Sequence, residues 1–348
     1  MLALTFQGIE NVSIETLPDP QIESPGDAIV AIRLAGICGS DLHVYHGRES
    51  GLDHGTALGH EFIGEVVETG PEVQHLTSGS LVLSPFNTSC GDCIPCRRGL
   101  TARCQRGQLF GWREQGTGLH GAQAELVRVP LADSTLVEVP AGVSPEQALL
   151  AGDVLSTGYY CAQQGGVEPG ANVVVIGCGP VGLMAILAAR HLGAERIFAV
   201  DRLSERLQLA EQFGGHRVDL RNDDLVAVIE EATSGQGADV ILEAVGSPEA
   251  SRLALDLVRP GGTISAVGVH TEPQFAFSPV AAYDKNLTYR IGRCPARHTM
   301  DMVLPWLAEM ENDPTVVISH RLSLSEGVRG YQIFANKTDR CTKVVLTP

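Results

Sequence analysis

The chain has 348 residues, of which 44% are hydrophobic, and it carries a formal net charge of −16 at pH 7. This length predicts two domains with ordinary buried cores. The acidic excess would repel the phosphates of nucleic acids and of anionic lipid headgroups, so neither nucleic acid nor a membrane is expected as a partner. The N-terminal residues lack the basic and apolar regions of a signal peptide, and a cytoplasmic protein is therefore expected.

Two segments near the N-terminus place potential metal ligands on loops beside predicted strands. The stretch AIVAIRLAGI, residues 28–37, alternates around its isoleucines as a strand does, and Cys38 follows it at once. His60 precedes a second strand-like stretch, FIGEVVET. Alone, either residue is weak evidence, because a lone cysteine is most often a small buried hydrophobic side chain.

Residues 90–104, CGDCIPCRRGLTARC, contain four cysteines within a short segment. These are Cys90, Cys93, Cys96 and Cys104. The spacing C-x2-C-x2-C-x7-C predicts a tetrahedral zinc that is closed to substrate and therefore structural. The odd total of nine cysteines argues against a disulfide framework. An iron–sulfur cluster and four unrelated buried cysteines are the weaker alternatives.

The strongest indication of a cofactor follows at the run VVVI, residues 173–176, which has no polar alternation and predicts a buried parallel strand. Gly177, Gly179 and Gly182 come next in the pattern G-x-G-x-x-G, and a helix is predicted over 183–192. These glycines permit a tight turn, close approach to a pyrophosphate and close packing of helix on strand. The N–H groups at the start of the helix would bind the phosphates.

A second predicted strand, residues 197–200, ends at Asp201, about 20 residues beyond the glycines. A carboxylate at this position accepts hydrogen bonds from the adenosine ribose and repels the extra phosphate of NADP, which favours NAD. The neighbouring Arg202 and Arg206 can accommodate that phosphate, so NADP remains an alternative. A doubly wound domain whose nucleotide site is empty, or takes another nucleotide, is the remaining reading.

Strands and helices continue to alternate further along the chain. The predicted elements are a helix over 204–213, a strand over 238–243, a helix over 248–258 and a strand over 263–267. This alternation specifies an α/β fold, a Rossmann doubly wound parallel sheet with right-handed crossovers. The region up to about residue 153 is rich in strands and is punctuated by prolines, which predicts a separate β-rich domain.

Several motifs now appear in a fixed order along the chain. They are GICGSDLH, GHEFIGEVVETG, the four-cysteine lobe, GDVLSTGYY, IGCGPVG and TKVVLT. Over almost its full length the chain resembles the zinc-dependent alcohol dehydrogenases of the medium-chain dehydrogenase/reductase superfamily. It is most similar to the branch that contains glutathione-independent formaldehyde dehydrogenases and related bacterial alcohol dehydrogenases, whose long insertions it lacks.

The resemblance implies three segments along the chain. Residues 1–153 would form a GroES-like catalytic domain with the structural zinc lobe at 90–104. Residues 154–290 would form the NAD-binding Rossmann domain, and residues 291–348 would return to the catalytic domain. The active site would then lie between the two domains.

The resemblance also implies that Cys38, His60 and Asp153 bind a catalytic zinc. Many members of the family have cysteine in the third position. One thiolate, one neutral imidazole and one carboxylate balance the charge of the dication as two thiolates and an imidazole would. The alternative for Asp153 is a helix N-cap, and Cys161 is the rival ligand.

Three protein ligands leave one position open for an alcohol, and the family pattern supplies the surrounding groups. Glu61 would lie behind the metal and enter its shell transiently, and Asp41 would orient His60. Ser40 would take the proton of the alcohol and pass it, through the nicotinamide ribose, to His43 near the surface. The alternatives are solvated charges for the two acids, a turn residue for Ser40 and a surface histidine for His43.

Four further residues are expected as coenzyme contacts. Thr157 would abut the nicotinamide, and Val269 would line its pocket, although the end of an apolar strand is equally simple core. Lys343 would contact the pyrophosphate. Arg206 would lie on the adenosine side with Asp201.

The sequence thus predicts an enzyme with two zinc ions per chain that transfers hydride between an alcohol and NAD, giving an aldehyde or ketone. A polyol or threonine dehydrogenase of the same family is the nearest alternative. A non-catalytic NAD-binding zinc protein acting as a redox sensor is the alternative of another class. The expected partner is a small-molecule substrate, and the resemblance implies a homotetramer, with a dimer as the alternative.

Overall fold

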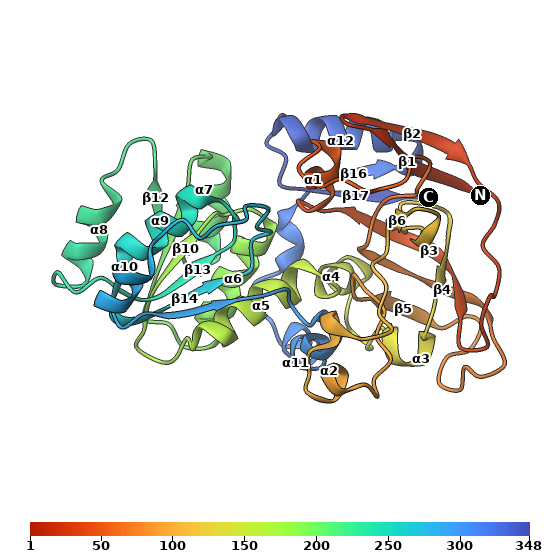
Figure 1. The fold of residues 1–348 in the computed structure, drawn as a ribbon, viewed down its shortest axis with the longest axis horizontal. Helices are drawn as coiled ribbons and strands as arrows, with labels where there is room; N and C mark the ends of the chain where they lie inside the picture. Colours follow the sequence, from red (N-terminus) through yellow and green to blue (C-terminus); the bar gives the residue numbers. More distant parts are fainter. The chain divides into compact units, whose positions relative to one another are not determined.

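The computed structural model describes residues 1–348 and divides them into two units. Unit 1 consists of Met1–Asp153 together with Pro295–Pro348, and unit 2 consists of Val154–Cys294 (Figure 1). The two ends of the chain therefore build unit 1, and unit 2 is inserted between them. No helix in either unit has the length and the apolar character needed to cross a bilayer.

Unit 2 is built on a six-stranded sheet that is parallel throughout. Its strands are β10 (Asn172–Ile176), β11 (Arg196–Asp201), β12 (His216–Asp219), β13 (Ala238–Glu243), β14 (Val258–Ala266) and β15 (Thr288–Ile291). Their order, β12-β11-β10-β13-β14-β15, places the first strand in the middle of the sheet, as in a doubly wound nucleotide-binding fold. The predicted fold class is confirmed for this unit.

One helix precedes β10, one helix lies between each pair of successive strands, and together they cover the sheet (Figure 1). They are α5 (Val154–Gly165), α6 (Pro180–His191), α7 (Ser204–Gln212), α8 (Leu225–Ala232), α9 (Pro248–Leu257) and α10 (Pro279–Asp284). The core between helices and sheet includes Val174, Ile241 and Ile264, which have no exposed surface. Burial on both faces explains why the central strands read as continuous apolar runs.

The predicted elements of unit 2 are confirmed with shifts at their ends, the largest being that β14 begins at Val258 rather than at residue 263. Sequence reasoning missed β12, α8, α10 and β15; of these, β12 and β15 are short strands in which half or more of the residues are exposed. The second domain boundary falls after residue 294 rather than after 290. The reason is that β15 pairs with β14 and so holds the chain in unit 2 through Ile291.

Unit 1 is rich in β-structure, as predicted. Its seven-stranded sheet contains β16 (Ile318–Ser323), β17 (Lys343–Thr347), β3 (Ala28–Ile37), β4 (Phe62–Thr69), β5 (Leu81–Ser84) and β9 (Val137–Glu138) in this order, with β8 (Leu126–Val129) also paired to β3. Two hairpins complete it, β1 (Leu2–Gly8) with β2 (Asn11–Thr16) and β6 (Trp112–Glu114) with β7 (Thr117–Leu119). The C-terminal segment thus supplies two strands to a sheet begun by the N-terminal segment.

Short helices fill the connections of unit 1. They are α1 (Asp41–Tyr45), α2 (Ile94–Arg97), α3 (Ala132–Thr135), α4 (Pro145–Ala151), α11 (Ala296–Ala308) and α12 (Gly327–Asn336), with 3-10 turns at Thr101–Arg103, Pro314–Val317 and Leu324–Glu326. Helix α4 begins with a capping box, in which Ser144 and Gln147 satisfy each other's backbone N–H groups. Tyr331 of α12 is completely buried and packs with Tyr45 of α1, so the C-terminal helix belongs to the same core as the first.

Candidate metal and coenzyme sites

The register of the unit 1 sheet brings the predicted ligands of the first metal group together. Strand β3 pairs antiparallel with β4 and places Ala35 opposite Phe62. Cys38, just after β3, and His60, just before β4, therefore lie at the same end of the sheet. Gly152 packs against β5 so closely that an added Cβ would lie 2.4 Å from the carbonyl oxygen of Ser84. Because Ser84 pairs with Phe62, this contact carries the adjacent Asp153 to the same end.

The side chains of this group converge. The Cys38 Sγ lies 3.3 Å from Asp153 Oδ2, and His60 Nε2 lies 3.4 Å from the same oxygen. The ligand atoms of these residues and of Glu61 all lie within 4.8 Å of one another. For zinc held at its usual bond lengths of about 2.0–2.3 Å, tetrahedral ligand atoms are about 3.3–3.8 Å apart, so the donor set fits that ion.

The electrostatics of the group also suit the binding of a cation. Burial, together with the nearby Asp153 and Glu61 carboxylates, raises the pKa of the Cys38 thiol to about 12. Burial opposes the charged form of Asp153, but the hydrogen bond and charge of His60 hold the pKa of Asp153 well below its usual range. A buried group that combines a thiol with carboxylates is costly without a positive charge, and a dication would supply it.

Asp41 holds two members of the group in place. Its Oδ1 lies 3.1 Å from His60 Nδ1, and its Oδ2 accepts a hydrogen bond of 2.9 Å from the Cys38 backbone N–H. With Nδ1 engaged in this way, His60 directs Nε2 toward Asp153. The geometry matches the expected role of Asp41 as the carboxylate that orients the histidine.

Glu61 has a partner that sequence reasoning missed. It is completely buried and forms a short ion pair with the ammonium of Lys343 on β17, which is also completely buried. Pairing of β17 with β3 brings Lys343 to this end of the sheet, since Val344 lies opposite Ile37. The charge of Lys343 is thus matched within unit 1, and the contact of Lys343 with a coenzyme pyrophosphate stays a prediction.

The small residue Gly36 leaves room for this ion pair. An added Cβ at Gly36 would lie 2.1 Å from Oε2 of Glu61. Gly36, the first glycine of LAGICGSD, is therefore a sequence feature on which the Glu61 ion pair depends.

The predicted proton relay begins next to the metal group. Ser40 Oγ lies 3.2 Å from His60 Nε2, so this hydroxyl faces the space between the ligands. His43, on α1, is half-buried, and its Nδ1 is buried without a hydrogen-bond partner. Burial lowers the pKa of His43, which favours the neutral form of the ring.

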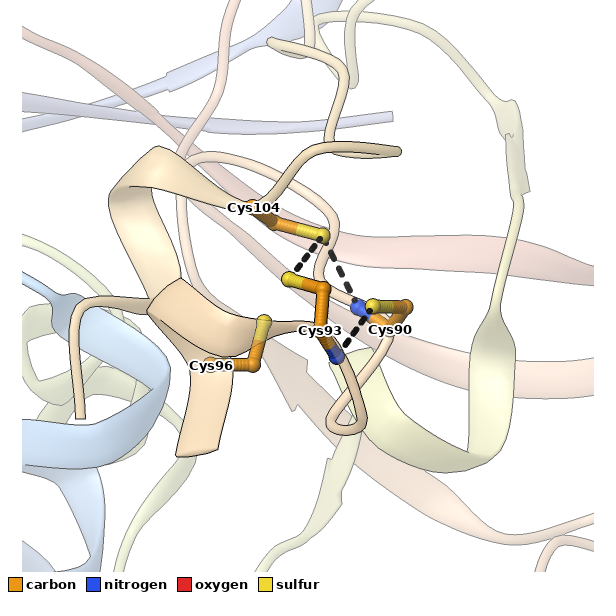
Figure 2. Close-up of side chains that lie close together, drawn as sticks. All are labelled: Cys90, Cys93, Cys96 and Cys104. Atoms are coloured by element: carbon orange, nitrogen blue, oxygen red, sulfur yellow. Dashed lines mark hydrogen bonds between the residues drawn. The ribbon is translucent and has the colours of Figure 1, made fainter. Parts of the chain in front are cut away.

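The four-cysteine lobe forms a second, separate group. Figure 2 shows the four side chains pointing toward one another. The sulfur atoms of Cys90, Cys93, Cys96 and Cys104 lie within 4.8 Å of one another, and all four are free thiols. The Sγ atoms of Cys93 and Cys104 are 3.9 Å apart, close to the ~3.8 Å expected for two sulfurs on one tetrahedral zinc.

Backbone N–H groups of the lobe point at these sulfurs. The N–H of Cys90 donates to Cys104 Sγ at 3.2 Å, and the N–H of Cys93 donates to Cys90 Sγ at 3.4 Å. Hydrogen bonds from the backbone of Gln105 and Cys96 lower the pKa of Cys93 to about 6. Burial instead raises the pKa of Cys96 to about 12 and raises that of Cys104, so a dication would be needed to hold all four as thiolates, as the predicted zinc would.

The glycine loop of unit 2 has the geometry that the motif predicts. Gly177 has a φ of +89°, a left-handed conformation that favours glycine. An added Cβ at Gly182 would lie 1.7 Å from the carbonyl oxygen of Gly177, so helix α6 could not approach the loop with any larger residue. Gly179 precedes α6, and its Cβ position is 3.6 Å from a guanidinium nitrogen of Arg206.

Asp201 closes this loop from the end of β11. Its Oδ2 accepts a hydrogen bond of 2.8 Å from the N–H of Cys178, within the glycine motif, and its Oδ1 accepts from the N–H groups of Arg202 and Leu203. A guanidinium nitrogen of Arg206 lies 3.8 Å from Oδ2. The structure therefore gathers Gly179, Asp201 and Arg206 at one corner of unit 2.

The remaining predicted residues also lie in unit 2. Thr157 is buried on α5, and Val269 is partly buried beyond β14, where its carbonyl would be 2.3 Å from an added Cβ on Gly246. Cys161, the rival metal ligand, lies on α5 with its sulfur 3.5 Å from the carbonyl oxygen of Ser265. Its thiol thus has a partner within unit 2, whereas Asp153 converges with Cys38 and His60 in unit 1.

Both units of the chain match families of known proteins. The model of the alcohol dehydrogenase GroES-like domain matches residues 24–141, and that of the zinc-binding dehydrogenase matches residues 180–309. The structure of alcohol dehydrogenase TADH from Thermus sp. ATN1 covers 100% of this chain and 99% of that chain, with 43% identity and a TM-score of 0.94. Zinc dependent alcohol dehydrogenase 2 from Streptococcus pneumonia covers 100% and 98%, with 33% identity and a TM-score of 0.91.

Curated relatives point to the same family. The uncharacterized zinc-type alcohol dehydrogenase-like protein AdhB of Bacillus subtilis is 36% identical over 100% of both chains. Zinc-type alcohol dehydrogenase B of Aspergillus flavus is 39% identical over 96% of this chain and 78% of its own. The chain therefore belongs to the zinc-dependent alcohol dehydrogenases of the medium-chain dehydrogenase/reductase superfamily. Its reaction class is the oxidoreduction of an alcohol, while its place in the formaldehyde dehydrogenase branch stays a prediction.

Proposed function

We propose that this oxidoreductase uses NAD as its hydride acceptor and holds two zinc ions per chain, one catalytic and one structural. The observation that carries the proposal is the convergence of Cys38, His60 and Asp153, three buried donors of different chemistry, beside the acidic Glu61. Three protein ligands leave a position for substrate, whereas the four-cysteine lobe has none to spare.

The residues around the first group have distinct parts in the proposed reaction. Zinc, when bound, would supply a Lewis acid that lowers the pKa of the substrate hydroxyl. The Ser40 hydroxyl lies beside the ligands and accepts the proton of the alcohol. His43 would receive that proton at the far end of the relay, and NAD, when bound, would supply the acceptor of the hydride.

Asp201 supports NAD over NADP. Both of its oxygens are held by backbone N–H groups of the glycine loop and of the segment after β11, so the carboxylate is fixed in place. A fixed negative charge at this corner opposes a 2′-phosphate. Arg206 is the residue that could offset it, and neighbours with NADP and with NADH bound are both known, at 27% and 25% identity.

A cytoplasmic homotetramer, with a dimer as the alternative, completes the proposal. The nine free thiols, four of them in one lobe, support a reducing compartment. The oligomeric state rests on the family resemblance, and light scattering of the purified protein measures it directly.

The test is reduction of NAD, and separately of NADP, with primary, secondary and polyhydroxy alcohols and with threonine, each with and without a chelator. Chelator-sensitive turnover with NAD is the expected result. Turnover that persists after both zincs are removed, or that requires NADP, would contradict the proposal. Protein that binds NAD, holds only one zinc and turns over no alcohol would favour the redox-sensor alternative.

A polyol or threonine dehydrogenase is the second candidate. L-threonine 3-dehydrogenase of Bacillus licheniformis is 30% identical over 98% of this chain and 96% of its own. The structure of 2R,3R-butanediol dehydrogenase from Bacillus subtilis has 25% identity and a TM-score of 0.83. A preference for threonine or a diol in the same panel would select this candidate without changing the two metal groups.

A further inference from the structure

A chain of hydrogen bonds leads from the C-terminal helix α12 to the predicted metal ligand His60. The hydroxyl of Tyr331 donates to Oε1 of Gln123 at 3.1 Å. Nε2 of Gln123 donates to Oδ2 of Asp41 at 3.2 Å and to the carbonyl oxygen of Gly36 at 3.0 Å. Asp41 then contacts Nδ1 of His60 at 3.1 Å, so three residues distant in sequence stand in line behind the ligand.

The partners of Gln123 dictate the orientation of its amide. Both groups near Nε2, the Asp41 carboxylate and the Gly36 carbonyl, can only accept hydrogen bonds. Rotating the amide by half a turn would aim its oxygen at two acceptors and its NH2 at the donor hydroxyl of Tyr331. Because the Tyr331 hydroxyl can donate as well as accept, the two acceptors at Nε2 are what fix the amide, and its oxygen then faces Tyr331.

Packing holds this chain rigidly. Gln123 and Tyr331 have no exposed surface, and Asp41 is 9% exposed. The Cγ of Gln123 lies against Gly59, where an added Cβ would be 2.4 Å away. The backbone N–H of Gln123 also donates to Leu58, so the residue is fixed directly beside the loop that carries His60.

We propose that Gln123 and Tyr331 are positioning residues for the catalytic zinc and that they act through Asp41 on His60 and on the backbone of Cys38. This inference rests on the proposed function, because it takes Cys38, His60 and Asp153 as zinc ligands. A buried carboxylate with several donors is held at one angle, and such outer partners normally affect metal affinity. The four-cysteine lobe contains none of the residues of this hydrogen-bonded series, so the zinc of the lobe serves as an internal reference.

The test compares the wild type with Tyr331→Phe, which removes one hydroxyl, and with Gln123→Met, which keeps the length of the side chain but removes both kinds of hydrogen bond. Tyr45→Phe is the matched control, because Tyr45 packs on Tyr331 in the same core. Zinc content is measured first. The release of each zinc to a colorimetric chelator is then followed, together with the melting temperature and the visible spectrum of the cobalt-substituted protein.

We expect release of the catalytic zinc to be about threefold to tenfold faster in Tyr331→Phe and faster still in Gln123→Met, with release from the lobe unchanged. The cobalt spectrum should change in both variants and not in Tyr45→Phe. A wild type that holds only the lobe zinc would overturn the proposed function and this inference together. Two zincs in the wild type with unchanged release in Tyr331→Phe, or equal acceleration of both zincs, would overturn the inference alone.

Discussion

The two metal groups of unit 1 are built in opposite ways. The four cysteines of the lobe lie within residues 90–104, and a few local backbone hydrogen bonds aim at their sulfurs. The first metal group is a mixed group, because it combines a thiol, an imidazole and a carboxylate. Its members Cys38, His60 and Asp153 come from three separate parts of the chain. A group closed within one loop can saturate its metal and stabilise that loop, whereas one assembled by a sheet can leave a position open and depends on the whole unit for its geometry.

The largest expected effect comes from removing Asp153, the proposed third ligand of the catalytic zinc. Asp153→Ala should lose one of the two zincs and lower turnover by more than about a hundredfold, since removing outer partners alone costs 10–100-fold. The lobe zinc should remain. Metal analysis and steady-state kinetics measure both quantities, with Asp133→Ala as control, because Asp133 is a partly exposed carboxylate of the same unit that bonds only to backbone N–H groups of residues 74 and 75. Two zincs in the Asp153 variant would contradict the ligand assignment.

Substitution in the lobe should produce the opposite pattern. Cys104→Ser should lose the other zinc and lower the melting temperature by about 5–10 °C, at about 2–4 °C for each kcal/mol in a domain of this size. The catalytic zinc should stay bound. Calorimetry and metal analysis test this, and Cys341→Ser makes the same change at a buried cysteine outside both groups. An unaltered melting temperature would show that the lobe does not depend on its metal.

A smaller effect is expected from Asp41→Asn. The two carboxylate oxygens of Asp41 contact the N–H of Cys38, the side-chain amide of Gln123 and Nδ1 of His60. An asparagine has only one acceptor oxygen, so it could not keep all three contacts. Affinity for the catalytic zinc should fall about tenfold, or about 1.4 kcal/mol, with the lobe unaffected. Competition with a chelator of known affinity measures it. Asp27→Asn, a buried carboxylate paired with Arg128, should alter stability without altering zinc affinity.

The smallest expected effect is a change in how the free energy of unfolding depends on pH, and it arises from His120, close in sequence to Gln123. Burial, followed by the charge of Arg113, lowers the pKa of His120 to about 4. Nδ1 of His120 accepts a hydrogen bond of 3.0 Å from the N–H of Ala57, three residues before His60, and protonation removes this acceptor. The unfolded chain therefore binds more protons between pH 6.5 and about 4, and stability is complete above this window and is lost as the pH falls through it.

Because His120 is only partly buried, solvent screening limits the contribution to about 1 kcal/mol. His120→Asn keeps an acceptor for Ala57 and removes the titration, so its free energy of unfolding should decline less between pH 6.5 and 4.5. Denaturant unfolding at several pH values, with chelator present to exclude metal loss, measures the difference. Identical slopes in variant and wild type would show that another group is responsible.

Local pattern was sufficient to predict the parts of this protein whose geometry is set by neighbours in the chain. The lobe followed from the spacing of its cysteines, and the nucleotide loop followed from glycines placed between a buried strand and a helix. In both, the determining contacts span few residues. For example, a Cβ added at Gly182 would lie only 1.7 Å from the carbonyl oxygen of Gly177. Short or half-exposed elements such as β12 were not predicted, because their residues show no strong hydrophobic periodicity.

The mixed metal group shows what sequence alone determined and what only the tertiary structure decided. Residue type and family motif named Cys38, His60 and Asp153, and Asp41 behind them. They did not indicate the ion pair of Glu61 with Lys343, nor the chain from Tyr331 through Gln123. These contacts join residues separated by hundreds of positions, and they exist because the pairing of β17 with β3 and the packing of α12 bring the two ends of the chain to one buried place. Their strength comes from burial, which no local pattern of residues specifies.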